Sequence, residues 1–380
     1  MEKSLIKGRI RVLFIVPSLR RAGAETQVVN LANGLDAEKF DKHLLIFEKE
    51  AEQVPRIDPS IRFHQAKRTR RWFDFPLVAQ VAKVIDSEGI DVVHCSLQFA
   101  LLWGWLGSRT AIRKPSVIAS LHTTINQGIK SELQDQLLYQ WILRACQGIV
   151  FVCERQQAYW ERKYPFLAGR SEVVYNGVDT DHFDPSAFRS EGQAFRVAHA
   201  LPDNAIVLAN VARFSPEKGQ HLLLKACAAL EPNVYLVFAG SGPLQGEMRR
   251  LANELGLAER VRFAGDLSDV RPLLAAADLL VLPSTAVETF SMAMLEALSM
   301  ATPVVGSDIG GMAEAVFDGE TGALVQPGDV ADLTRTIEAL VTDRARLKDM
   351  GSNGRGLVVK RFSETLMIER TAEVIRRVPR

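Results

Sequence analysis

The sequence alternates short apolar runs with amphipathic stretches, and this alternation constrains the fold more than any other feature. Amphipathic segments predict helices, among them 24–34, 77–88, 220–229 and 246–255. Strands alternating with helices form parallel sheets covered on both faces, so we predict an α/β protein. The predicted strands form two series, first 11–16, 43–47, 92–95, 117–121 and 148–152, then 206–211, 235–239, 261–264, 279–282 and 303–307.

The two series predict two doubly wound domains, which suits a chain of 380 residues. They meet near residues 175–179, where Asn176 and Gly177 form a turn signal. We place the first domain at 1–172, the second at 173–361 and a terminal helical segment at 362–380.

Composition and charge argue against several classes of protein. A net charge of +1 argues against a general nucleic-acid binder. The four cysteines are scattered without a Cys-x-x-Cys pair, which argues against a disulfide or zinc framework and suits a reducing compartment. We see no secretory signal and no apolar run long enough to span a bilayer. We therefore expect a cytoplasmic protein.

Two glutamates follow the predicted strand 279–282, where a helix begins. Glu288 and Glu296 stand eight positions apart in the stretch from Pro283 to Ala297. The start of a helix offers free N–H groups and the positive end of its dipole, which together bind anions. Carboxylates there would repel a phosphate unless they face hydroxyls of the same ligand. A nucleotide sugar meets both requirements.

Three other loops follow strands, and ligands of open α/β sheets bind at strand carboxyl ends. Arg213 and Lys218 could neutralise a diphosphate, although loop cations are often simply solvated. Gly23 would allow close approach to a phosphate, but the loop lacks G-x-G-x-x-G spacing and could be a plain turn. Gly240 and Gly242 allow close approach too, or form an ordinary glycine-rich turn.

Two histidines, His94 and His122, end neighbouring predicted strands. A histidine in this place is more often a hydrogen-bonded structural residue than a ligand-binding one. Both readings stay open on the residues alone.

Taken together, the loops resemble the retaining glycosyltransferases of the large family-four group, which have a GT-B fold. The resemblance covers essentially the whole chain and is densest over 210–322. It rests on the E-x7-E element Glu288…Glu296, on Arg-Phe-Ser-Pro-Glu-Lys-Gly at 213–219, on Ala-Gly-Ser-Gly-Pro at 239–243 and on Asn-Gly-Val-Asp at 176–179. It implies two Rossmann-like domains facing across a cleft, with the C-terminal helix packing back on the N-terminal domain.

The resemblance also implies catalytic roles. Glu288 would contact donor-sugar hydroxyls as a positioning group, and His122 would lie beside that sugar. Arg213 and Lys218 would hold the diphosphate and stabilise it as it leaves. The donor-binding set is Gly23, Gly240, Gly242, Asp266, Leu267, Thr289, Phe290, Ser291 and Glu296, with Glu296 on the ribose and 266–267 near the base.

The sequence departs from the family pattern in two places. The common Gly-Gly-Ala-Glu is Ala-Gly-Ala-Glu at 22–25, and the common Glu-Gly-Phe-Gly is Glu-Thr-Phe-Ser at 288–291. Both changes remove flexible positions and put the donor contacts in doubt. Asp179 and Asp181 mimic the D-x-D element of metal-dependent transferases, but they fall in the linker. We therefore expect no metal and no cofactor.

The first domain would choose the acceptor. The segment 99–106 contains Trp103 and Trp105, and the basic run 67–71 is followed by Trp72 and Phe73. Aromatic residues with flanking cations can contact an anionic membrane, although the two tryptophans could equally be core residues of a helix. A saccharide or lipid-linked saccharide acceptor, with peripheral contact at the inner face of the plasma membrane, remains a hypothesis.

The sequence thus predicts a retaining, metal-independent glycosyltransferase that uses a nucleotide-diphosphate sugar, in bacterial surface-polysaccharide or glycolipid assembly. One rival is another GT-B sugar enzyme, such as a nucleotide-sugar 2-epimerase or a glucan synthase. A rival of another class is a non-catalytic nucleotide-sugar binding protein. The sequence does not identify the donor base, the donor sugar, the acceptor or the linkage that is formed.

Overall fold

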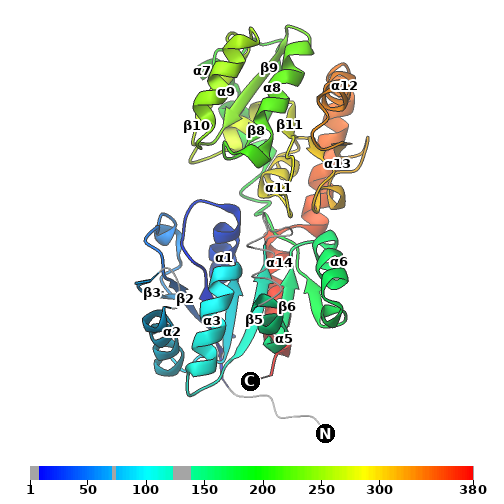
Figure 1. Ribbon diagram of the computed structural model, residues 1–380. Helices are drawn as coiled ribbons and strands as arrows, with labels where there is room; N and C mark the ends of the chain where they lie inside the picture. Colours follow the sequence, from blue (N-terminus) through cyan, green and yellow to red (C-terminus); the bar gives the residue numbers. More distant parts are fainter. Residues whose placement is uncertain (1–7, 71–73, 123–137, 380) are drawn as a thin grey trace. The chain divides into compact units, whose positions relative to one another are not determined.

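The computed structural model describes residues 8–70, 74–122 and 138–379 (Figure 1). The chain divides into two compact units. The first contains residues up to Gly177 together with 364–380, and the second contains Val178–Ser363. The last helix of the chain, α14 (Glu364–Arg377), therefore belongs to the first unit.

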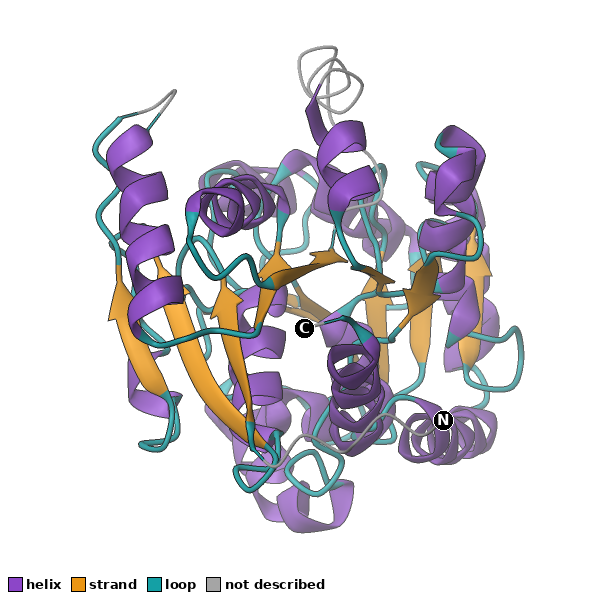
Figure 2. Ribbon diagram, turned by 90° about the horizontal axis from the view of Figure 1, so that it is seen from below, coloured by secondary structure: helices purple, strands orange, loops and turns teal. Residues whose placement is uncertain are grey.

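The first unit contains a seven-stranded parallel sheet in the order β3-β2-β1-β4-β5-β6-β7. Helices lie on either side of the strands (Figure 2). The strands are β1 (Ile10–Ile15), β2 (Phe40–Ile46), β3 (Arg62–Gln65), β4 (Val92–Ser96), β5 (Ser116–Leu121), β6 (Gly148–Phe151) and β7 (Ser171–Val173). The helices before α14 are α1 (Gly23–Gly34), α2 (Phe75–Ser87), α3 (Gln98–Thr110), α5 (Gln140–Ala145) and α6 (Glu154–Lys163).

Strand β1 shows how both faces of this sheet are buried. Val12 and Phe14 pack into one core with residues of α1 and α14, whereas Leu13 and Ile15 pack into another with residues of α2, α3 and α5. Successive side chains of a strand point to opposite faces, so an uninterrupted apolar run is what a doubly covered strand requires. Helix α14 supplies Met367, Ala372, Val374 and Ile375 to the first of these cores.

The second unit contains a six-stranded parallel sheet in the order β10-β9-β8-β11-β12-β13. Its strands are β8 (Ile206–Val211), β9 (Val234–Ala239), β10 (Val261–Gly265), β11 (Leu279–Leu282), β12 (Val304–Ser307) and β13 (Gly322–Val325). Its helices are α7 (Arg189–Ala198), α8 (Gln220–Ala229), α9 (Gln245–Glu254), α10 (Arg271–Ala276), α11 (Met292–Ser299), α12 (Val330–Val341) and α13 (Arg344–Arg361).

The strand order reverses once in each sheet. In the first unit the reversal lies between β1 and β4, and in the second it lies between β8 and β11. At such a point the loops on the two neighbouring strands diverge and leave room for a ligand. Asn210 fixes this geometry in the second unit, because its side-chain amide donates to the Val281 carbonyl at 2.8 Å.

The predicted α/β class with two doubly wound sheets is confirmed. Three strands were not predicted: β3, β7 and β13. All three lie at sheet edges, have only three or four residues and are partly exposed, so each gives a weaker sequence pattern than a central strand. Among the described residues, no helix is both long and apolar enough to cross a bilayer.

Candidate functional site

Two loops meet at the reversal point of the second sheet, one after β8 and one after β11. Ser215 leads into a single 3-10 turn, Pro216–Lys218, and Gly219 follows with φ of 66°. A Cβ at Gly219 would lie 2.1 Å from the Pro283 carbonyl oxygen, so a side chain would separate the loops. The Thr285 N–H donates to the Glu217 carbonyl at 2.8 Å and joins the loops directly.

This junction brings the predicted Lys218 and Glu288 together. The Lys218 ammonium donates to Glu288 Oε2 at 2.7 Å, and the Ser284 hydroxyl donates to the same oxygen at 3.0 Å. The Glu288 side chain is 10% exposed and that of Lys218 is 25% exposed. An ion pair this sheltered is screened less than a surface pair, and its members are held in place. Ser284 was not singled out from the sequence, although it lies in the same stretch.

Helix α11 begins at Met292, four positions after Glu288. Ser291 caps it, because its hydroxyl accepts from the Met294 N–H at 3.4 Å. The ring of Phe290 is buried and packs edge-on against Phe362 at 5.2 Å between centroids. This ring therefore belongs to the core, and the predicted donor contact at Phe290 would have to come from its backbone.

Gly310 packs closely against the same loop. Its φ is 55°, and a Cβ there would lie 1.8 Å from the Glu288 carbonyl oxygen. The neighbouring Gly311 N–H donates to the Thr289 carbonyl at 2.6 Å. The close packing of residues 288–289 thus depends on Gly310.

Glu296 lies on α11, about one turn after the helix begins at Met292. Burial of its carboxyl group raises its pKa to about 7, although part of the residue remains accessible. Desolvation favours the neutral form of the carboxyl group, which can donate as well as accept a hydrogen bond.

The remaining predicted donor residues of this unit differ in their surroundings. Arg213 is exposed, and its backbone carbonyl accepts from the Gln220 side chain at 2.9 Å. Gly240 and Gly242 have φ of 128° and 158°, and Cβ atoms there would lie 2.2 Å and 2.4 Å from the carbonyl oxygens of Ala212 and Phe214. These glycines therefore let two loops pack together, a role that needs no ligand.

Asp266 and Leu267 follow β10, at the same carboxyl edge of the sheet. Asp266 is exposed and Leu267 is partly buried. In the linker, the Asp179 carboxylate accepts from the N–H groups of Asp181 and His182 at 3.1 Å and 2.9 Å. The D-x-D sequence thus shapes a turn through the side chain of Asp179.

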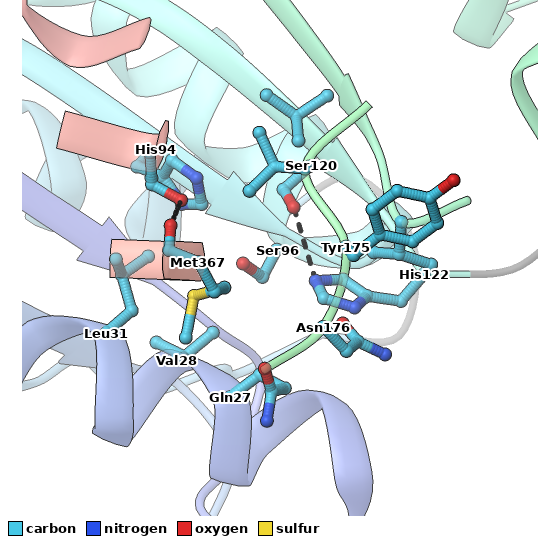
Figure 3. Close-up of a pocket in the computed structure, with 14 residues that line it drawn as sticks. Gln27, Val28, Leu31, His94, Ser96, Ser120, His122, Tyr175, Asn176 and Met367 are labelled. Carbon is cyan, nitrogen blue, oxygen red and sulfur yellow. Dashed lines mark hydrogen bonds between the residues drawn. The ribbon is translucent and has the colours of Figure 1, made fainter. Parts of the chain in front are cut away.

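In the first unit, Gly23 is exposed and begins α1, after the loop that follows β1. His94 lies in β4 and His122 follows the end of β5 (Figure 3). Both line a small pocket of about 30 Å³ that also contacts Gln27, Asn176 and Met367. Burial lowers the pKa of His94 to about 3 and that of His122 to about 4.

The aromatic and basic residues of the first unit separate into two groups. Trp103 is buried and Trp105 is partly buried against the same core, which supports the core reading for both. By contrast, Phe99 and Phe75 are 52% and 73% exposed, and Arg68 lies over the Phe99 ring at 5.4 Å. Arg71, Trp72 and Phe73 lie outside the described residues.

Two doubly wound units, each with one reversal of the strand order, have the architecture of the GT-B fold. The crystal structure of HepE from Anabaena in complex with UDP has this fold, with a TM-score of 0.85 and 25% identity over 97% of this chain and 100% of that one. The complex of the same protein with UDP-glucose matches equally well.

The chain belongs to glycosyltransferase family 4. Residues 21–182 match the model described as Glycosyltransferase Family 4, and residues 192–357 match the model described as Glycosyl transferases group 1. The family that the sequence resembles is therefore confirmed.

Two curated relatives come from bacterial systems. EpsD of Bacillus subtilis, named as a glycosyltransferase, is 29% identical over 303 residues, which span 78% of each chain. LpsE of Rhizobium meliloti, named as a lipopolysaccharide core biosynthesis glycosyltransferase, is 34% identical over 197 residues. That match spans 51% of this chain and 57% of LpsE.

Proposed function

We propose that this glycosyltransferase is retaining and metal-independent, and that it moves a sugar from a nucleotide-diphosphate sugar to a saccharide or glycolipid acceptor. The observation that carries the proposal is the Lys218–Glu288 pair of 2.7 Å at the reversal point of the second sheet. A cation for a phosphate and a carboxylate for hydroxyl groups stand side by side there, and helix α11 begins next to them.

The negative charge that develops on the leaving diphosphate is the main demand on the site. In transfer, the bond from the anomeric carbon to the β-phosphate oxygen breaks, and a bond to the acceptor oxygen forms. Lys218, Arg213 and the first N–H groups of α11 would stabilise the released diphosphate. These groups supply positive charge without a bound metal, which is why we propose metal independence.

The surroundings of Glu288 favour a positioning role over covalent attack. Both hydrogen bonds to its carboxylate, from Lys218 and Ser284, end on Oε2. Its other oxygen, Oε1, could then accept from donor-sugar hydroxyls. A carboxylate engaged in this way is a poor nucleophile, so retention would come from attack by the acceptor hydroxyl on the face from which the diphosphate leaves. The acceptor proton would pass to the departing phosphate oxygen.

The donor and the acceptor are proposed from the relatives. HepE was crystallised with UDP and with UDP-glucose, so a uridine diphosphate sugar is the first donor to test. LpsE is named for lipopolysaccharide core biosynthesis, which supports a role in bacterial surface-polysaccharide assembly. Phe75 and Phe99 are exposed, Arg68 lies over the Phe99 ring, and Arg70 is two residues further along the chain. Such a group of aromatic and basic side chains would suit peripheral contact with an anionic membrane.

The first experiment is a thermal-shift screen with UDP, GDP, ADP and their common sugars, with and without EDTA. We expect one nucleoside diphosphate to raise Tm, and the shift to survive EDTA. Loss of the shift in EDTA would contradict metal independence. No shift with any nucleotide would contradict the proposed donor site.

A second experiment tests the reaction. With the identified donor, the anomeric configuration of the product is read by NMR, and α-product from an α-linked donor is expected. Turnover of the donor that requires an acceptor separates transfer from epimerisation. Inversion at the anomeric carbon would refute the retaining assignment.

A further inference from the structure

The pocket in the first unit contains a polar cluster around His122. The Ser120 hydroxyl of β5 lies 3.3 Å from Nε2 of His122, which follows the end of this strand (Figure 3). Ser96 of the neighbouring strand pairs with Ser120 in register, and His94 lies two residues before it. These four residues line the pocket together.

The pocket environment keeps His122 uncharged. Its lining combines aliphatic side chains with hydroxyl, amide and imidazole groups, and the described lining residues include no carboxylate, lysine or arginine that could pair with an imidazolium. Burial lowers the pKa of His122 to about 4, and burial together with repulsion from His122 lowers that of His94 to about 3. At neutral pH His122 is therefore unsuited to act as a charged acid.

A neutral imidazole has one N–H donor and one acceptor nitrogen, and the partner of one nitrogen decides the role of the other. For His122 the recorded partner is Ser120, at Nε2. If the hydroxyl donates to Nε2, the proton resides on Nδ1. The ring then has a fixed donor for a hydroxyl oxygen of the sugar that the proposed function places beside it.

The rim of the pocket is also held in place. Gln27 of α1 donates to the Gly177 carbonyl at 2.8 Å and accepts from the Gly177 N–H at 2.9 Å. This pair of bonds ties the segment containing Tyr175 and Asn176, which line the pocket with His122, to the first unit. The rim segment is therefore held against α1.

We propose that Ser120 is a positioning residue for His122, holding the imidazole by donation to Nε2 and so fixing the proton on Nδ1. The value of this arrangement to catalysis rests on the proposed function, since it assumes that His122 contacts the donor sugar. The tautomer itself does not depend on that assumption.

The test uses the full chain labelled with ¹⁵N-histidine and without nucleotide. Long-range ¹H–¹⁵N spectra distinguish the two tautomers, and His122→Gln assigns the signal. We expect the Nδ1–H form of His122 in the wild type and in Ser120→Thr, which keeps the hydroxyl. Ser120→Ala should give a mixture of tautomers. Ser96→Ala removes a hydroxyl from the same pocket without a recorded bond to His122, and it should leave the signal unchanged.

An Nε2–H tautomer in the wild type, or an identical spectrum for Ser120→Ala, would overturn the proposal. Kinetics test the function separately. Ser120→Ala should lower kcat by about two- to tenfold, the value of one hydrogen bond, with the donor KM little changed. If His122→Gln leaves turnover unchanged, the proposed contact with the donor fails even where the tautomer result holds.

Discussion

Lys218 and Glu288 are 70 residues apart in the sequence, yet the Lys218 ammonium lies 2.7 Å from Glu288 Oε2. The cation proposed for the diphosphate is thus already paired in the protein without ligand. A phosphate must share or displace this partner, so the two side chains should affect nucleotide binding in opposite directions.

Removing the carboxylate should separate binding from chemistry. Glu288→Ala frees the Lys218 ammonium, so the affinity for the nucleoside diphosphate should stay the same or rise. Turnover should fall by roughly 10²-fold or more, because the donor sugar loses a positioning group. Calorimetry with UDP and initial rates measure the two effects. Glu320→Ala, which removes an exposed glutamate, is the control. Weaker UDP binding combined with unchanged turnover would contradict this assignment.

Removing the Lys218 ammonium should lower both the nucleotide affinity and the turnover. In Lys218→Ala the diphosphate loses a charged hydrogen bond and faces an unpaired Glu288, so affinity should fall about tenfold or more. Lys225→Ala, at an exposed position on α8, should have no effect. The double variant of Lys218 and Glu288 should recover part of the affinity. Equal nucleotide affinity for wild type and Lys218→Ala would refute the diphosphate assignment.

The raised pKa of Glu296, about 7 against an ordinary 4.5, predicts a pH dependence of stability. The folded protein favours the protonated form, so this contribution to stability is complete below about 4.5 and is lost as pH rises through about 7. Without ligand, Glu296→Gln should match the wild type in Tm near pH 4.5 and exceed it near pH 8. Parallel Tm profiles for the two proteins would show that the carboxyl group is not desolvated as described.

Gly310 should be sensitive to substitution for a steric reason. Gly310→Ala combines a left-handed backbone with a Cβ placed 1.8 Å from the Glu288 carbonyl oxygen. Gly328→Ala is the matched control, because its φ is 82° and nothing lies within 4 Å of the added Cβ. Each should lose about 1 kcal/mol from backbone strain. Gly310→Ala should lose further stability and also nucleotide affinity, measured by denaturant unfolding and calorimetry. Equal effects of both substitutions would mean that the loop relaxes freely.

Membrane contact is tested at the exposed aromatic residues. Combining Phe99→Ser with Arg70→Glu should reduce co-sedimentation with anionic vesicles severalfold and weaken the binding to zwitterionic vesicles less, because only the loss of Phe99 acts there. Ile112→Ser is the control, because Ile112 is 90% exposed just beyond the other end of α3. Absence of vesicle binding by the wild type would leave no support for the membrane hypothesis.

The sequence predicted the fold well because central strands carry continuous apolar runs, and it predicted the loops of the site because each follows such a strand. Three of the four edge strands, β3, β7 and β13, escaped prediction because each has at most four residues and only part of it is buried. The hydrogen-bond partners of Glu288 could not be predicted from the sequence either. Nothing in the order of residues states that Ser284 shares Oε2 of Glu288 with Lys218. The packing role of Gly240 and Gly242 was likewise hidden, because a glycine motif does not reveal which backbone approaches it.

Helix α14 affects the order in which the two units can fold during synthesis. It supplies Met367, Ala372, Val374 and Ile375 to a core whose other buried members, apart from Val378, come from the first 174 residues of the chain. The second unit, by contrast, is continuous from Val178 to Ser363. On the ribosome, the second unit can therefore be completed while the first still lacks one of its packing layers. We expect the half that is translated first to reach its native state last, and a chaperone or a temporary cover to matter most for the surface that α14 finally closes.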